Sequence, residues 1–203
     1  MGTIRRTIVF CCLFAVTVGA VQAQQSKDIP VRAAGMAAAC SACHGTPERP
    51  PLGGTPSLAG QQKEFLVLQM FLLREGLRDV PQMAGLLKRL SDRDLEDVAA
   101  YFSRQPSLPR IAARDPQLHA RGAGMARAMG CGSCHLPDFR GQRQVPRIAN
   151  QREDYLSAAM KAYRDNKRTG LDTTTGSDAN MNGVLSKVTD SDIQALAHYL
   201  AHL

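Results

Sequence analysis

The chain has no tryptophan and few other aromatic residues, with six Phe and four Tyr among 203 residues. Aromatic side chains supply much of the buried area in small domains, so two small domains of this composition would have thin cores. A large apolar prosthetic group would fill the space that is left. The shortage of aromatics therefore agrees with a bound cofactor, although it does not identify one.

Long hydrophobic runs are absent beyond the N-terminus, and no other segment could cross a bilayer, which takes about 20 apolar residues. At the N-terminus, Arg5 and Arg6 precede an apolar run over residues 7–21 and a small-residue cleavage site that ends at Ala23. This order predicts a cleavable signal peptide over residues 1–23 and export to the periplasm. An uncleaved anchor is the alternative, but the run is short for a bilayer span.

No cysteine is left over for a structural disulfide. Two of the six cysteines lie inside the predicted signal peptide, and the other four form two copies of one pentapeptide. These copies are Cys40-Ser41-Ala42-Cys43-His44 and Cys131-Gly132-Ser133-Cys134-His135. Cys-x-x-Cys-His is the attachment signature of c-type haem.

The spacing of this motif has a physical reason. Two cysteines three residues apart lie on one helical turn and can form thioethers with the two vinyl groups of a porphyrin. The histidine beside them is then held under the iron. We therefore expect two covalently bound haem c groups, attached through Cys40, Cys43, Cys131 and Cys134, with His44 and His135 as iron ligands.

Other uses of paired cysteines fit less well. A single zinc ion held by both pairs would place them some 15–20 residues apart, far closer than they are here. A thioredoxin-like redox site would need a βαβ context, which the pattern does not offer. The trailing histidine in both copies favours haem.

The formal charge of +7 falls to +5 once Arg5 and Arg6 are removed with the signal peptide. The four propionates of two haems would nearly cancel that value. Basic and aromatic residues do not alternate in the way that nucleic-acid-binding surfaces show. We expect a mixed, solvated surface and no nucleic-acid partner.

The whole plan of the chain repeats. Residues 31–42 and 58–77 have helical composition and periodicity, and Ser91 with Asp94 predicts a capped final helix. Matching stretches follow the second motif, including Met181-Asn182-Gly183 for Met83-Ala84-Gly85. Strand-like stretches are few, so the predicted fold class is all-α. The predicted domains are residues 24–105 and 117–203, joined by a proline-rich linker over residues 106–116.

A c-type haem also needs a sixth iron ligand or a deliberate vacancy, and methionine sulfur paired with histidine suits electron transfer. Met83 and Met181 lie at matching places in loop-like segments ahead of the final helix of each half, so we expect them to be the ligands. The other methionines of the mature chain belong to apolar helical faces or lie too near a motif. The remaining histidines have no repeat partner and are expected at the surface or at helix ends; they are His119, His198 and His202.

The order of these motifs, twice over, resembles the dihaem class I cytochromes c of the c-four type. The resemblance covers nearly all of the mature chain and implies two tandem class I cytochrome c domains, each wrapping one covalent haem. It implies His44 and His135 as proximal ligands and Met83 and Met181 as distal ligands. It also implies that the backbone carbonyls of two prolines accept hydrogen bonds from the proximal imidazoles; these are Pro56 and Pro146.

The resemblance further implies that a small residue ahead of the first cysteine lets the first helix cross the last one closely. Gly124 has this place in the second half, opposite Tyr199, whereas Ala33 has it in the first half. A polar stretch over residues 169–180 also lengthens the second half ahead of Met181. We expect the two haems to differ in potential.

The expected function is that of a soluble periplasmic electron carrier and not an enzyme. The donor would be a quinol-oxidising complex or a dehydrogenase, and the acceptor a terminal oxidase or reductase. The alternative is the dihaem subunit of a periplasmic dehydrogenase complex, such as a flavocytochrome sulfide dehydrogenase. A dihaem peroxidase would need an open iron position and a longer chain.

Overall fold

The structure is a computed structural model, and it describes residues 31–109, 115–168 and 178–203. The predicted signal peptide, part of the predicted linker and most of the polar stretch over residues 169–180 lie outside these ranges. The described residues form helices and two isolated β-bridges, with no β-strand among them, so the all-α prediction is confirmed.

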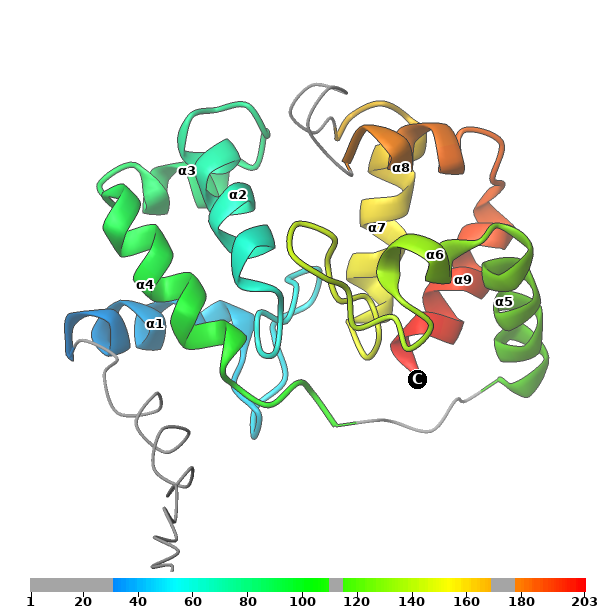
Figure 1. Ribbon diagram of the computed structural model, residues 1–203, viewed down its shortest axis with the longest axis horizontal. Coiled ribbons are helices and arrows are strands. Elements are labelled where there is room, and N and C mark those ends of the chain that lie inside the picture. Colours follow the sequence, from blue (N-terminus) through cyan, green and yellow to red (C-terminus); the bar gives the residue numbers. More distant parts are fainter. Residues whose placement is uncertain (1–30, 110–114, 169–177) are drawn as a thin grey trace, which may run out of the picture.

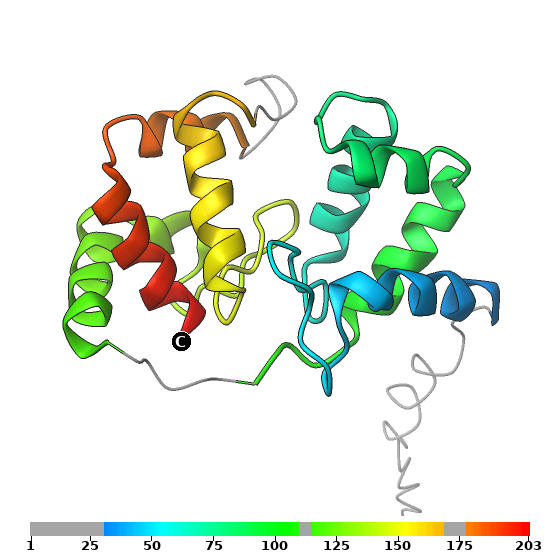
Figure 2. The ribbon, with the colours of Figure 1, turned by 180° about the vertical axis from the view of Figure 1, so that it is seen from behind.

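The helices form two neighbouring domains (Figures 1 and 2). The N-terminal domain contains α1 (Val31–His44), α2 (Lys63–Arg74), α3 (Pro81–Leu87) and α4 (Asp92–Ser103). The C-terminal domain contains α5 (Pro116–Ala128), α6 (Cys131–His135), α7 (Glu153–Arg164), α8 (Asp178–Leu185) and α9 (Asp190–Ala201). None of the described helices is long and apolar enough to cross a membrane.

The final helix of each domain begins with a capping box, as the sequence predicts. The Ser91 side chain accepts a hydrogen bond from the backbone of Asp94, whose carboxylate accepts one from the Ser91 backbone. Thr189 and Asp192 form the same arrangement at the start of α9. Both boxes satisfy backbone N–H groups that have no partner within the helix.

Two helix predictions need correction. The helix expected from residue 58 begins only at Lys63, because Gly60 has φ +67° and its N–H donates to the carbonyl of Phe102 on α4. Met83 and Met181 were expected in loop-like segments, but they lie within α3 and α8. In α3, Pro81 at the first turn stabilises the helix start because its fixed φ suits that position.

Each domain has its own apolar core. Leu66, Leu73 and Phe102 are among the buried residues of the N-terminal core, against which Met83 packs. Leu156 and Leu196 are among those of the C-terminal core, against which Met181 and Cys131 pack. Two separate cores agree with two separately packed units.

The close crossing of the first and last helices was predicted at the wrong glycine. A Cβ on Gly122 would overlap with the carbonyl oxygen of Ala195 and lie 2.6 Å from the Cβ of Tyr199. A Cβ on Gly124 would meet nothing within 4 Å. The close approach of α5 to α9 therefore depends on Gly122, while in α1 Ala33 is fully buried.

The domains meet through the loops that follow the two motifs and through the first turns of α2 and α7 (Figures 1 and 2). The Gln62 side chain donates to the carbonyls of Arg140 and Gly141. In the opposite direction, the Arg152 guanidinium donates to the carbonyl of Pro51. The contact is reciprocal, since corresponding residues of each half reach the loop of the other.

Candidate haem-binding sites

The first motif forms the C-terminal end of α1, and this places Cys40, Cys43 and His44 close together on the last turn of that helix. Neither cysteine forms a disulfide; Cys43 is exposed and Cys40 is partly buried. Burial is the main cause that raises the pKa of Cys40 above its usual range. The two sulfurs are thus close together on one helical turn, where they can bond to the edge of one porphyrin.

His44 is buried, and its Nδ1 lies 2.8 Å from the carbonyl oxygen of Pro56. A carbonyl can only accept a hydrogen bond, so Nδ1 must carry the proton, and the lone pair of the neutral ring is then on Nε2. Burial lowers the pKa of His44, while the bond to Pro56 acts in the opposite direction. The imidazole is therefore held in the form that ligates a metal.

The second motif is built differently. Helix α5 ends before the motif, Gly130 adopts a left-handed conformation with φ +67°, and the short helix α6 then carries Cys131, Cys134 and His135. Despite this break, Nδ1 of the buried His135 lies 2.9 Å from the carbonyl oxygen of Pro146. Both halves thus fix the same tautomer of the motif histidine.

A glycine with positive φ turns the chain after each motif. Gly45 has φ +77°, and its N–H donates to the carbonyl of Ser41. Gly141 has φ +72°, and its N–H donates to the carbonyl of His135. A Cβ on Gly141 would overlap with the carbonyl of Pro146, so a side chain there would disturb the acceptor of the His135 hydrogen bond.

The two candidate methionines are partly buried at matching places. Met83 packs against the N-terminal core and Met181 against the C-terminal core. Each is held on a short helix, and in the second half Asn182 ties α8 to α7 by donating to the carbonyl of Tyr163. The donor set of each half is two thiols, one neutral imidazole and one thioether, which fits a covalent haem with two protein axial ligands.

Two of the histidines outside the motifs lie at a helix end, as predicted: His198 is in the last turn of α9 and His202 is its C-cap residue. Both are buried and are not at the surface. His198 lies 3.1 Å from a carboxylate oxygen of Glu153 and accepts from the N–H of Asp115. His202 donates to the carbonyl of His198. These bonds occupy both ring nitrogens of His198 and Nδ1 of His202, and they join α7 and α9 to the residue that precedes α5.

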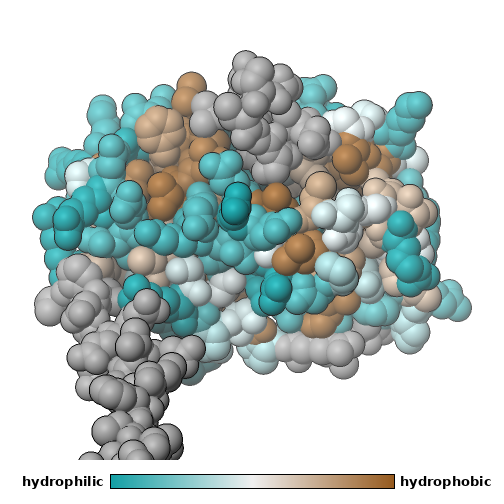
Figure 3. All heavy atoms as spheres, in the orientation of Figure 1, coloured by the Kyte–Doolittle hydropathy of each residue, from teal (hydrophilic) through white to brown (hydrophobic). Residues whose placement is uncertain are grey.

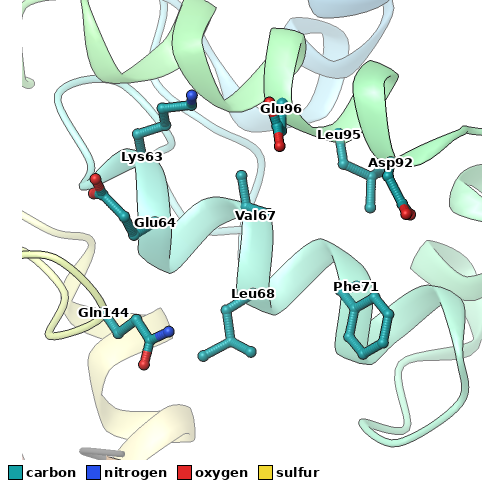
Figure 4. A pocket seen from close by; sticks show the side chains of 9 residues that line it. All are labelled: Lys63, Glu64, Val67, Leu68, Phe71, Asp92, Leu95, Glu96 and Gln144. Carbon is teal, nitrogen blue, oxygen red and sulfur yellow. The ribbon is translucent and has the colours of Figure 1, made fainter.

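A groove of about 490 Å³ lies along α2 and α4, away from both motifs (Figure 4). Figure 4 shows Val67 and Leu95 facing this space from the two helices, while Gln144 approaches from the other domain. None of the motif residues, candidate methionines or prolines lines it. The groove is therefore distinct from the haem sites.

Comparisons with known proteins place both halves in one class. The Cytochrome c family profile matches residues 119–203, and the profile described as cytochrome c oxidase, cbb3-type, subunit III matches residues 30–102. Both halves are thus c-type cytochrome domains.

Similar full-length proteins identify the particular family. Cytochrome c4 of Pseudomonas aeruginosa is 34% identical over 82% of this chain and 85% of its own length. The thiosulfate dehydrogenase electron acceptor of Thiomonas intermedia is 32% identical over 81% of this chain and 78% of its own. The crystal structure of reduced cytochrome c4 from Pseudomonas stutzeri superimposes with a TM-score of 0.74 at 33% identity, covering 85% of this chain and 97% of that one.

The chain belongs to the cytochrome c4 family. It is an electron carrier with two cytochrome c domains, and it carries two covalent haem c groups at the motifs of Cys40 and Cys43 and of Cys131 and Cys134. The predicted family, the all-α fold of two cytochrome c domains and the two haem c groups are thus confirmed.

Proposed function

We propose that His44 and Met83 are the axial ligands of the N-terminal haem iron, and that His135 and Met181 are those of the C-terminal one. The observation that carries this proposal is the hydrogen bond from each motif histidine to a proline carbonyl, at 2.8 Å for His44 and 2.9 Å for His135. It places the proton of each ring on Nδ1, so that Nε2 carries the lone pair with which a neutral imidazole ligates iron. The carbonyls of Pro56 and Pro146 orient the rings and increase their basicity.

When bound, each haem supplies a one-electron iron couple. The protein's part is to fill both axial positions, to exclude water from the iron and to hold the ligands in place in both oxidation states. His–Met ligation serves this purpose, because it favours a high-potential, low-spin iron. With both positions filled, the site has no place for a substrate.

The Met-sulfur-to-iron charge-transfer band of the oxidised protein tests this assignment. Met83→Leu and Met181→Leu should each remove about half of the band, because each substitution removes the sulfur ligand of one of the two haems. Met70→Leu is the matched control, since Met70 lies in the apolar core, and it should leave the band intact. An unchanged band in Met83→Leu or Met181→Leu would refute that ligand.

The protein acts in the periplasm as a freely diffusing carrier, between a quinol-oxidising complex or dehydrogenase as donor and a terminal oxidase as acceptor. The N-terminal export signal predicted from the sequence supports this location. Leu86 and Val184, 70% and 43% exposed, follow the two proposed methionine ligands at matching places and offer apolar contacts to a redox partner. Hydrophilic residues cover much of the face in Figure 3, with separate apolar areas between them.

A second candidate function is that of the dihaem subunit of a periplasmic dehydrogenase complex. The similarity to the Thiomonas electron acceptor favours it, since that protein is named for accepting electrons from thiosulfate dehydrogenase. Purification from native cells separates the two functions. Elution as a single chain supports the free carrier, whereas stable co-elution with a catalytic subunit supports the complex.

A further inference from the structure

The peptide group that joins Pro56 to Ser57 makes hydrogen bonds at both ends. Its carbonyl oxygen accepts from Nδ1 of His44 at 2.8 Å. Its N–H, on Ser57, donates to Oε1 of Gln151 at 2.8 Å. His44 belongs to the N-terminal domain and Gln151 to the C-terminal domain. A single peptide group thus connects a motif histidine to a side chain of the other domain.

The same connection exists in the opposite direction. The carbonyl of Pro146 accepts from Nδ1 of His135 at 2.9 Å, and the adjoining N–H of Arg147 donates to Oε1 of Gln61 at 2.7 Å. Gln61 lies in the N-terminal domain and matches Gln151 in the repeat. Each domain therefore supports the motif histidine of its neighbour.

Both glutamines are held firmly. Gln61 and Gln151 are only 5% and 7% exposed. Oε1 of each also accepts from the N–H of the next residue in its own chain, at 2.9 Å and 3.0 Å. Nε2 of Gln61 donates to the carbonyl of Arg147, and Nε2 of Gln151 donates to the carbonyl of Ser57, both at 2.9 Å. Donors on one side and an acceptor on the other determine which way each amide points.

The chemical effect follows from the polarisation of the peptide group. When its N–H donates to a glutamine oxygen, electron density moves toward its carbonyl oxygen, which becomes a stronger acceptor. A stronger acceptor draws the Nδ1 proton of the histidine and makes the ring a better electron donor to iron. A more donating ring stabilises the oxidised iron and lowers the potential.

We propose that Gln151 tunes the N-terminal haem and Gln61 the C-terminal haem, each acting from the opposite domain through one peptide group. Both glutamines are positioning residues, because they reach iron only through the proline carbonyl and the histidine. Docking of the domains then sets both potentials. The inference rests on the proposed ligation by His44 and His135.

Redox titration of the holoprotein tests the inference, with the two steps assigned through the spectra of Met83→Leu and Met181→Leu. Gln151→Leu should raise the potential of the N-terminal haem more than that of the C-terminal haem. Gln61→Leu should show the reverse. Gln62→Leu is the matched control, because Gln62 also bonds across the interface but to the carbonyls of Arg140 and Gly141. It should not reproduce either pattern.

A second readout follows the hydrogen bond itself. The hyperfine-shifted Nδ1–H resonance of His44 in the oxidised protein should move in Gln151→Leu and stay in place in Gln61→Leu. If Gln151→Leu does not fold, Gln151→Glu retains an acceptor oxygen and should lower the potential of the N-terminal haem.

Equal shifts at both haems, or the same shifts in Gln62→Leu, would overturn the inference, since they indicate general loosening of the interface. Unchanged potentials would overturn it as well. Absence of the Met-sulfur charge-transfer band in the unmodified protein is a different result. It contradicts the proposed methionine ligands, whereas the effect of each glutamine on the haem of the opposite domain is decided by the potentials of Gln151→Leu and Gln61→Leu.

Discussion

Gly122 on α5 lies directly against the backbone of Ala195 on α9, with no room for a side chain between the two helices. Gly122→Ala should therefore force the helices apart and destabilise the C-terminal domain by about 1–3 kcal/mol, as overpacking typically does. Chemical denaturation followed by circular dichroism measures this change.

Gly124→Ala is the matched control, two residues along the same helix. A Cβ there meets open space, so the substitution should stabilise the domain by about 0.5–1 kcal/mol because alanine favours helix more than glycine does. Equal effects of the two substitutions would contradict the crossing described above.

The capping box of α4 predicts a local loss of stability. Ser91→Ala removes a hydroxyl that donates to the Asp94 carboxylate at 2.7 Å and accepts from the Asp94 N–H. It should cost about 0.5–2 kcal/mol of unfolding free energy. It should also raise the pKa of Asp94, because the bonds to Ser91 are the main cause that lowers it.

Unfolding titrations near neutral pH measure the loss of stability. An NMR pH titration of the Asp94 carboxylate measures the change in its pKa. Ser103→Ala, at the other end of the helix, removes a hydroxyl that bonds only to the carbonyl of Ala100. Its effect should be clearly smaller, and a comparable loss would show that the cap is not the cause.

The lowered pKa of Asp154 predicts that the protein loses stability in acid. Hydrogen bonds from Arg152 are the main cause that lowers the pKa of Asp154 to about 2, and the N–H of Gly54 in the other domain adds to them. The unfolded chain titrates near its ordinary value of about 3.9. The carboxylate therefore stabilises the fold above about pH 4, and this contribution is lost as the pH falls toward 2.

Unfolding curves between pH 2 and 5 should show the unmodified protein losing more stability than Asp154→Asn over this range. Asp138→Asn, which changes an aspartate with a 60% exposed side chain, is the control. A constant difference between the protein and Asp154→Asn across the whole range would contradict the assignment.

A substitution at Gly141 is expected to change the potential of the C-terminal haem alone. Gly141→Ala places a Cβ against the carbonyl of Pro146 at a positive φ, so it should weaken the hydrogen bond from His135 and raise that haem's potential. Gly54→Ala has the same φ of +72° but open space around it, so it should cost stability without moving either potential. Redox titration and unfolding curves together separate the two outcomes.

The repeat allowed much of this structure to be predicted from the sequence. Patterns that depend on neighbouring residues are predicted correctly, such as the capping box of Ser91 and Asp94. They are visible in sequence because the interactions span only three residues. Pairing of the halves also identified Met83 and Met181 as matching positions, although not their helical setting.

The errors concern packing between distant segments. The glycine at the crossing was assigned by counting back from the motif, and the break at Gly130 between α5 and α6 altered that count. The burial of His198 was not predicted, because its hydrogen-bond partners, Glu153 and Asp115, come from elsewhere in the chain. Gln61 and Gln151 matched in the repeat, but nothing in the sequence showed that the two domains face each other.

The reciprocal glutamine contacts also bear on how a duplicated gene can diverge. Across the interface, Gln61 and Gln151 bind main-chain atoms of the opposite domain, so these hydrogen bonds do not depend on which side chain stands at the two contacted positions. Those positions are now Ser57 in one half and Arg147 in the other. After duplication, the two copies could thus differ in the side chain at this position while these main-chain contacts were kept.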